Sequence, residues 1–301
     1  MTMKLFSVCL FTIFKRPLLN YTIFRHNSYS SHNLQMDSKG ISLQEVVEKL
    51  KKIAPLSLAE SWDNVGLLVE PDRNAKISSV LLTIDLTEDV VDEALKTGSQ
   101  LIISYHPNIF RPLKSVTNST WKERIVIKCI KYGIAVFSPH TSWDAMENGV
   151  NDWLGSFVEA SKSSPILPNA ENPKLGMGRC LHLKTPISLQ EVINGVKSHI
   201  GLRHLRLGLG IGKELDSPVN VIALCAGAGT SVLANTDADL YLTGEMSHHE
   251  VLEATQRGIN VILCNHSDSE RGYLKTFQKL FENEELSVHV SSRDKDCLTT
   301  V

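Results

Sequence analysis

Short apolar runs alternate with amphipathic helical patterns along most of this chain, and this alternation restricts its fold more than any other feature. The expected strands span Ser79–Ile84, Leu101–Ser104, Ile134–Ser138, Arg179–Leu183, Leu205–Leu209, Val219–Cys225, Leu240–Thr243 and Val261–Cys264. The expected helices span Ile41–Ile53, Glu88–Lys96, Thr120–Tyr132, Val150–Ala160, Leu189–Ile200, Met246–Arg257 and Ser269–Phe281. Such alternation indicates β–α–β crossovers, so we predict an α/β protein with parallel or mixed sheets and flanking helices.

The expected elements fall into two α/β halves, at residues 41–160 and 179–297. Between them, residues 161–178 hold several prolines and glycines, which are typical of a linker. This linker is too short to contain another domain. No tandem repeat is evident along the chain.

The composition excludes several classes of protein. Hydrophobic residues make up 42% of the 301 residues and charged residues 21%, which excludes a disordered or collagen-like chain. The 31 lysines and arginines are balanced by 33 acidic residues, so we expect no direct nucleic-acid binding. No apolar run reaches the roughly 18 residues of a membrane span. The six cysteines form no CxxC pair, which argues against a zinc knuckle or a disulfide framework.

The first 36 residues form a distinct leader. They contain four basic residues and no acidic one, and the first carboxylate of the chain is Asp37. A basic, acid-poor, serine-bearing leader is typical of a mitochondrial transit peptide, so we expect a mitochondrial location. Two alternatives stay open: the apolar stretch Leu5–Phe14 belongs to a secretory signal, or translation starts at Met36 and the protein is cytoplasmic.

Histidine and carboxylate side chains recur just beyond the expected strands. They are His106; His140 and Asp144; Glu245, His248 and His249; and His266 and Glu270. Ligands of open α/β sheets gather outside the carboxyl ends of the strands. Because imidazole and carboxylate groups suit zinc, iron or manganese, this pattern predicts a metal site.

Each of these residues also has an ordinary structural explanation. His106 and Asp144 are placed where a residue ends a strand or caps a helix, and His266 and Glu270 have the spacing of an exposed helical pair. Two loops are weaker candidates for function. Gly227 and Gly229 follow a strand and suit either a phosphate or an ordinary turn. We expect Trp62–Gly66 to be a polar turn with a packed tryptophan.

Several motifs occur in a fixed order and carry a resemblance. They are Ser61–Val69, Ser104–Pro107, His140–Asp144, Gly149–Asp152, Thr243–Glu245 and Asn265–Gly272. Over residues 41–297 the chain resembles the NIF-three-like family, also catalogued as GTP cyclohydrolase I type 2 proteins, and most of all its animal members. The resemblance implies two related α/β halves, a metal centre between them and a ring-shaped homo-hexamer.

The resemblance also implies roles for individual residues. The metal ligands would be His106, Asp144, His266 and Glu270, and Glu245 and His249 would act in catalysis by positioning water or substrate. Tyr105 stands where the bacterial pattern has a further histidine. A phenol with a reference pKa near ~10 is a poorer ligand, so we expect one or two divalent metals (Zn, Fe or Mn) per chain.

Two classes of function follow from these expectations. The first is a divalent-metal-dependent hydrolase that acts on a nucleotide-like or phosphorylated small molecule. The second is a non-enzymatic metal-binding regulatory protein with a transcription-linked protein partner, because the name of the family comes from interaction with a transcriptional adaptor. Motif geometry predicts a site better than it predicts a reaction, so both remain open.

Overall fold

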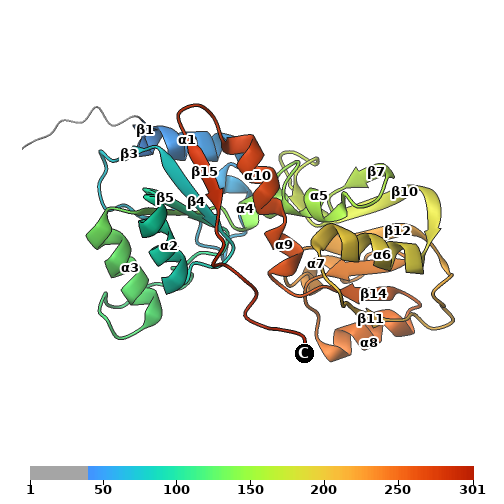
Figure 1. The fold of residues 1–301 in the computed structure, drawn as a ribbon. Coiled ribbons are helices and arrows are strands. Elements are labelled where there is room, and N and C mark those ends of the chain that lie inside the picture. The colour runs from blue at the N-terminus through green and yellow to red at the C-terminus, as the bar shows by residue number, and fades with distance from the viewer. Residues whose placement is uncertain (1–39) are drawn as a thin grey trace, which may run out of the picture. The chain divides into compact units, whose positions relative to one another are not determined.

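Two mixed β-sheets with flanking helices form the part of the chain that the computed structural model describes, residues 40–301 (Figure 1). The predicted leader, and with it the predicted location, lies outside the described residues. Within the described residues, no helix is both long and apolar enough to cross a membrane.

The first sheet has five strands in the order β15-β4-β5-β6-β2. Four of them run parallel, and β2 is antiparallel to β6. Their bounds are β2 Gly66–Val69, β4 Ser79–Thr83, β5 Leu101–Ser104, β6 Ala135–Ser138 and β15 Ser287–Val290. Helices α2 (Glu88–Thr97) and α3 (Trp121–Tyr132) cover one face, and α1 (Leu43–Ile53) and α10 (Tyr273–Phe281) pack on the other. Every residue of β5 and β6 is buried, as expected for strands covered on both faces.

The second sheet has six strands in the order β11-β14-β13-β12-β10-β7. The three strands β12, β13 and β14 run parallel, and the others are antiparallel to their neighbours. The bounds are β7 Ala160–Ser164, β10 Arg179–Ser188, β11 Arg206–Gly208, β12 Pro218–Cys225, β13 Leu240–Thr243 and β14 Asn260–Leu263. Helices α7 (Thr230–Leu233) and α8 (His248–Gln256) cover one face, and α6 (Leu189–Ile200) packs on the other.

The remaining elements are short and connect the two sheets or border them. They are β1 Ile41–Ser42, β3 Lys76–Ile77, β8 Leu167–Pro168, β9 Gly176–Met177, the 3-10 helix η1 Leu56–Leu58, α4 Thr141–Ala145, α5 Val150–Gly155 and α9 Asp268–Arg271. One apolar core joins both sheets, because Leu82 of β4 and Leu224 of β12 belong to the same buried cluster. The predicted α/β fold with mixed sheets is confirmed.

A short internal repeat relates the two halves. Ile41–Val46 and Ile187–Val192 have the same sequence, and in each copy the serine and the glutamate form the capping box of the next helix. In each sheet an antiparallel strand (β2 or β11) is followed in the chain by three consecutive parallel strands (β4, β5 and β6, or β12, β13 and β14) and pairs with the third of these. No tandem repeat is evident in the sequence, because the two copies share obvious identity only over this short stretch.

The observed elements depart from the predicted boundaries at three places, two of which concern strands and one a helix. The strand β15 lies in the predicted second half, yet it pairs with β4 of the first sheet. The strand β7 begins in the predicted helix Val150–Ala160 and continues into the predicted linker, because α5 already ends at Gly155. β7 is a polar edge strand, so it carries no alternating apolar pattern that a sequence could reveal. The expected helix Ser269–Phe281 is divided at Gly272 into α9 and α10.

Candidate metal centre

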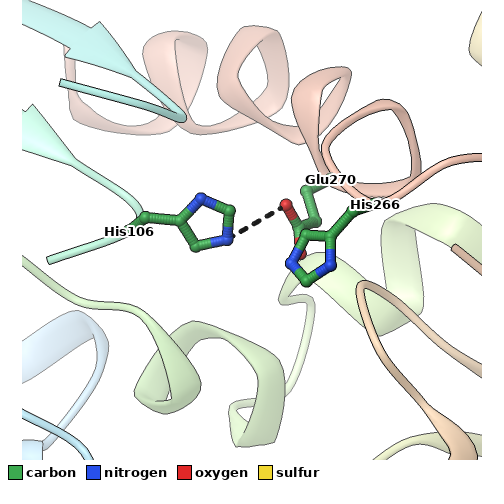
Figure 2. A group of neighbouring side chains, drawn as sticks. All are labelled: His106, His266 and Glu270. Carbon is green, nitrogen blue, oxygen red and sulfur yellow. Dashed lines mark ion pairs between the residues drawn. The ribbon is translucent and has the colours of Figure 1, made fainter. Parts of the chain in front are cut away.

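Three side chains from distant parts of the chain converge at the carboxyl ends of the strands. His106 follows β5, and His266 and Glu270 come from the segment that leads from β14 into α9 (Figure 2). Their candidate ligand atoms all lie within 4.8 Å of one another. Both imidazoles present Nε2 to the same carboxylate: His106 Nε2 lies 3.4 Å from Glu270 Oε2, and His266 Nε2 lies 3.4 Å from Glu270 Oε1.

The other ring nitrogen of each imidazole, Nδ1, lies against a further carboxylate, which is a different one for each histidine. His106 Nδ1 lies 2.9 Å from Asp85 Oδ1, and His266 Nδ1 lies 3.3 Å from Glu245 Oε2. In a neutral imidazole, a carboxylate on Nδ1 favours the tautomer that leaves Nε2 unprotonated, which is the usual arrangement around a metal-binding histidine. The two histidines are therefore oriented in the same way, one by Asp85 after β4 and the other by Glu245 after β13.

Glu270 and Gly227 give an independent test of whether a metal fits. Glu270 is buried, and its Oε2 has no hydrogen-bond partner among the described residues, which is a costly arrangement for an ionised carboxylate. A Cβ atom at Gly227 would lie 2.7 Å from Glu270 Oε1 and 3.2 Å from His266 Nε2, so only glycine leaves this space free. Two imidazoles and one carboxylate with an open side are a ligand set that suits a catalytic zinc or a similar divalent ion. The residues present fit such a metal.

The charge state of His106 reflects its two acidic neighbours. Burial by itself would lower the pKa of His106, but the negative charge of Glu270 and the hydrogen bond that His106 donates to Asp85 outweigh it and raise the pKa to about 10. Without a metal the imidazole therefore keeps its proton at neutral pH. A divalent cation that binds here takes the place of that proton.

Asp144 lies next to this group but is not part of it. Its Oδ1 accepts a hydrogen bond of 2.5 Å from the Tyr105 hydroxyl, and burial raises the pKa of Asp144 to about 6. Burial and the charge of Asp144 also raise the pKa of Tyr105, so the phenol stays protonated at neutral pH. Asp144 lines a cavity of about 310 Å³ together with His266 and Glu270. The structure thus brings three of the four predicted ligands together. The fourth, Asp144, lines a cavity that two of these three also line.

The two predicted catalytic residues lie in different places. Glu245 lines an open cavity of about 670 Å³ together with His106, His266 and Arg206. His249 lies on α8 and lines a separate cavity of about 550 Å³. It lines neither of the two cavities that the converging residues border, the one with His106 and His266 and the one with His266 and Glu270.

His140 and Asp144 are the counterparts of His266 and Glu270 in the other half. Each histidine and its carboxylate are four residues apart, and the two pairs follow β6 and β14, which occupy equivalent places next to the antiparallel strands β2 and β11. His140 Nδ1 lies 2.7 Å from the carboxylate of Asp63, whose pKa is lowered: burial would raise it, but the hydrogen bonds from His140 and Thr141 outweigh that effect. The repeat thus brings a second histidine and carboxylate to the rim of the site.

The sequence profile of the family described as Duf34/NIF3 (NGG1p interacting factor 3) matches residues 41–297. The chain belongs to this family. Among NIF3 relatives, the NIF3-like protein 1 of Drosophila melanogaster is 46% identical over 265 residues, which cover 87% of this chain and 90% of the relative. The NGG1-interacting factor 3 of Saccharomyces cerevisiae is 37% identical over 278 residues, covering 85% of this chain and 96% of the relative.

A solved NIF3-related structure shows the same fold. The Bacillus cereus protein related to NIF3 has a TM-score of 0.78 and 22% identity, and the match covers 88% of this chain and all of that one. The resemblance that the ordered motifs indicated is confirmed. Sequence reasoning missed Asp85 and assigned Gly227 no role in a metal site. It also expected a packed Trp62, which is wrong because this side chain is 58% exposed.

Proposed function

We propose that this NIF3-family protein binds a divalent metal at His106, His266 and Glu270 and hydrolyses a small nucleotide-like or phosphorylated compound. The observation that carries the proposal is the matched orientation of the two imidazoles. Each has a carboxylate on Nδ1 and directs Nε2 to the buried, under-bonded carboxylate of Glu270. An ordinary ion pair on the protein surface does not need both histidines to be held by a carboxylate on Nδ1.

The chemistry that a divalent metal supplies in such a site is activation of water for hydrolysis. The chain itself positions the ligands: Asp85 and Glu245 hold the two histidines in the tautomer that offers Nε2. Asp144 and Tyr105 form a hydrogen-bonded pair beside the site. Because the pKa of Asp144 lies at about 6, this carboxyl exchanges a proton near neutral pH and is suited to general acid–base catalysis.

Arg206 favours a phosphorylated substrate. It lines the cavity of about 670 Å³ that also contains His106, Glu245 and His266. Among the ion pairs of residues 40–301, none involves Arg206, so its guanidinium is available to a phosphate. A phosphate held there would lie in the same cavity as two of the three proposed ligands.

Metal loading and a substrate panel test this proposal. The purified protein is stripped of metal, reloaded separately with Zn²⁺, Fe²⁺ or Mn²⁺, and assayed for hydrolysis of nucleoside phosphates, sugar phosphates and purine rings. We expect metal-dependent turnover that Glu270→Gln and His266→Ala abolish. His248→Ala is the matched control, because His248 is an exposed histidine that borders neither cavity of the site, and it should keep its activity.

The second candidate function is that of an interaction protein, and the name of the yeast relative, NGG1-interacting factor 3, favours it. Under this proposal the metal stabilises a surface that binds a protein partner. A folded, metal-loaded protein that hydrolyses nothing in the panel would support this function and refute the hydrolase. We also propose that the protein assembles as a homo-hexamer, for which light scattering should give six times the mass of the chain. A monomer across micromolar concentrations would contradict that assembly.

A further inference from the structure

A tryptophan borders the cavity on the Asp144 side of the candidate metal centre. Trp62 is 58% exposed and follows η1 in the loop that leads into β2. It lines the cavity of about 310 Å³ together with residues of the site, among them Tyr105, His140, Asp144 and Glu270. Single exposed apolar side chains are common on proteins, so exposure alone carries no function. The contacts that fix the loop beside Trp62 are the further observation.

Buried polar contacts anchor the loop directly beside Trp62. The side chain of Asp63 is completely buried and pairs with His140 Nδ1 at 2.7 Å. Its other oxygen accepts hydrogen bonds from the backbone N–H of Thr141 at 3.2 Å and from its hydroxyl at 2.5 Å. The side-chain amide of Asn64 donates to a carbonyl in the loop after β5. The backbone on which the exposed Trp62 side chain stands is therefore fixed by the contacts of the next two residues.

The same contacts hold His140 in a strained backbone conformation. Its φ is +34° and its ψ is −119°, values that residues other than glycine rarely adopt. Such strain persists only where surrounding contacts fix it, and it is concentrated at ligand sites. The conformation places the imidazole between two aromatic rings, with centroids 6.0 Å from Trp62 and 5.5 Å from Tyr105.

The indole ring of Trp62 meets its aromatic neighbours only edge to face. The interplanar angle is 68° with Phe110 and 77° with His140, at centroid distances of 6.0 Å in both cases. Within residues 40–301, no aromatic ring stacks on the face of Trp62. An aromatic face without a stacked partner, at the mouth of a cavity, is a platform for a planar ligand.

We propose that this cavity binds a planar heteroaromatic ring that stacks on Trp62. Its walls combine apolar side chains with polar groups that suit the edge of such a ring: Leu167, Met177, Val232, Ser231 and Asp144. The cavity shares His266 with the larger one that Arg206 lines. The inference rests on the proposed function and extends it, because the substrate then has its ring on the Asp144 side of the metal group and its phosphate on the Arg206 side.

Calorimetric titration of the zinc-loaded full chain tests the ring separately from the phosphate. The probes are AMP, GMP and CMP, with ribose 5-phosphate as the matching phosphate that lacks a ring. We expect Trp62→Ala to weaken nucleotide binding about tenfold, which corresponds to the loss of one stacked base. Trp62→Phe should recover most of the affinity, because a phenyl ring still stacks. Ribose 5-phosphate should bind equally to all three proteins.

Trp121→Ala is the matched control, because Trp121 is also exposed and borders none of the cavities of the site. It should leave nucleotide binding unchanged. The proposal is overturned if no nucleotide binds the unmodified protein, if Trp62→Ala leaves nucleotide binding unchanged, or if it weakens ribose 5-phosphate equally. It is also overturned if Trp62→Ala only abolishes self-association, since Trp62 then belongs to an interface between copies. Nucleotide binding without hydrolysis would refute the proposed reaction and leave the ring site standing.

Discussion

Replacing Gly227 by alanine tests directly whether Glu270 and His266 hold a metal. Gly227 has a φ of +64°, and an added Cβ would lie 2.7 Å from Glu270 Oε1. Ordinary contacts begin at 3.4 Å, so the carboxylate must move by about 0.7 Å, whereas metal–ligand distances tolerate only about 0.2 Å. We therefore expect Gly227→Ala to weaken zinc binding by at least the roughly tenfold to hundredfold that the loss of an outer supporting contact costs.

Gly98→Ala separates this effect from backbone strain. Gly98 ends α2 with a φ of +69°, and a Cβ there would meet nothing within 4 Å. Both variants place alanine in the left-handed region, so each should lose about 1–2 kcal/mol of unfolding free energy. Only Gly227→Ala should lose zinc affinity.

Isothermal titration with zinc and urea denaturation of the metal-free proteins measure the two quantities. Circular dichroism confirms that both variants are folded before the titrations are compared. If Gly227→Ala binds zinc as tightly as the unmodified chain, Glu270 is not a ligand in the position that the structure gives it. If Gly98→Ala loses zinc equally, the loss reflects general strain, and the argument from the glycine contact fails.

Three further predictions concern the metal count, the pH dependence and the leader. We expect close to one tight metal per chain by elemental analysis after dialysis, because the protonated phenol of Tyr105 is hydrogen-bonded to Asp144. In Tyr105→His the metal content should rise towards two. Two tight metals in the unmodified chain would refute this. The raised pKa of His106 means that the folded, metal-free chain keeps a proton that the unfolded chain releases. The stability this proton provides is complete below pH 6.5 and is lost as the pH rises towards about 10. Urea midpoints across this range should therefore fall, and less so in His106→Asn; a flat profile would contradict the assignment. Residues 1–40 fused to a fluorescent reporter should direct it to mitochondria, and a diffuse cytosolic signal would favour initiation at Met36.

The sequence predicted the parts of the site that local patterns encode. His106 is the second residue after β5, and His266 and Glu270 are one helical turn apart after β14. Their positions beyond the strand ends and their spacing were therefore sufficient to find them. Asp85 lies two residues after the end of β4 and obeys the same rule. It was missed because its partner His106 comes from the next strand, and no histidine adjoins Asp85 in the sequence.

Pairings and contacts between distant residues could not be predicted in this way. The strand β15 is short and follows the whole second sheet in the sequence, and only its pairing with β4 identifies it as part of the first sheet. The role of Gly227 depends on Glu270, which comes from another loop, so the sequence suggested only a turn or a phosphate site. Glu245 and His249 belong to one motif, yet the start of α8 separates them and directs them to different cavities.

The position of β15 has a consequence for biosynthesis. A chain that leaves the ribosome from its N-terminus makes β4 long before Ser287–Val290, so the edge of the first sheet stays unpaired until all strands of the second sheet have been synthesised. The residues after β15 then add Asp294, whose carboxylate accepts hydrogen bonds from the backbone of Ile84 and Asp85 and pairs with Arg271. The first half therefore cannot complete its folding during translation, as many N-terminal domains do. A nonsense mutation that ends the chain before Ser287 would leave an open sheet edge at the N-terminal half, with the aggregation risk that such an edge brings.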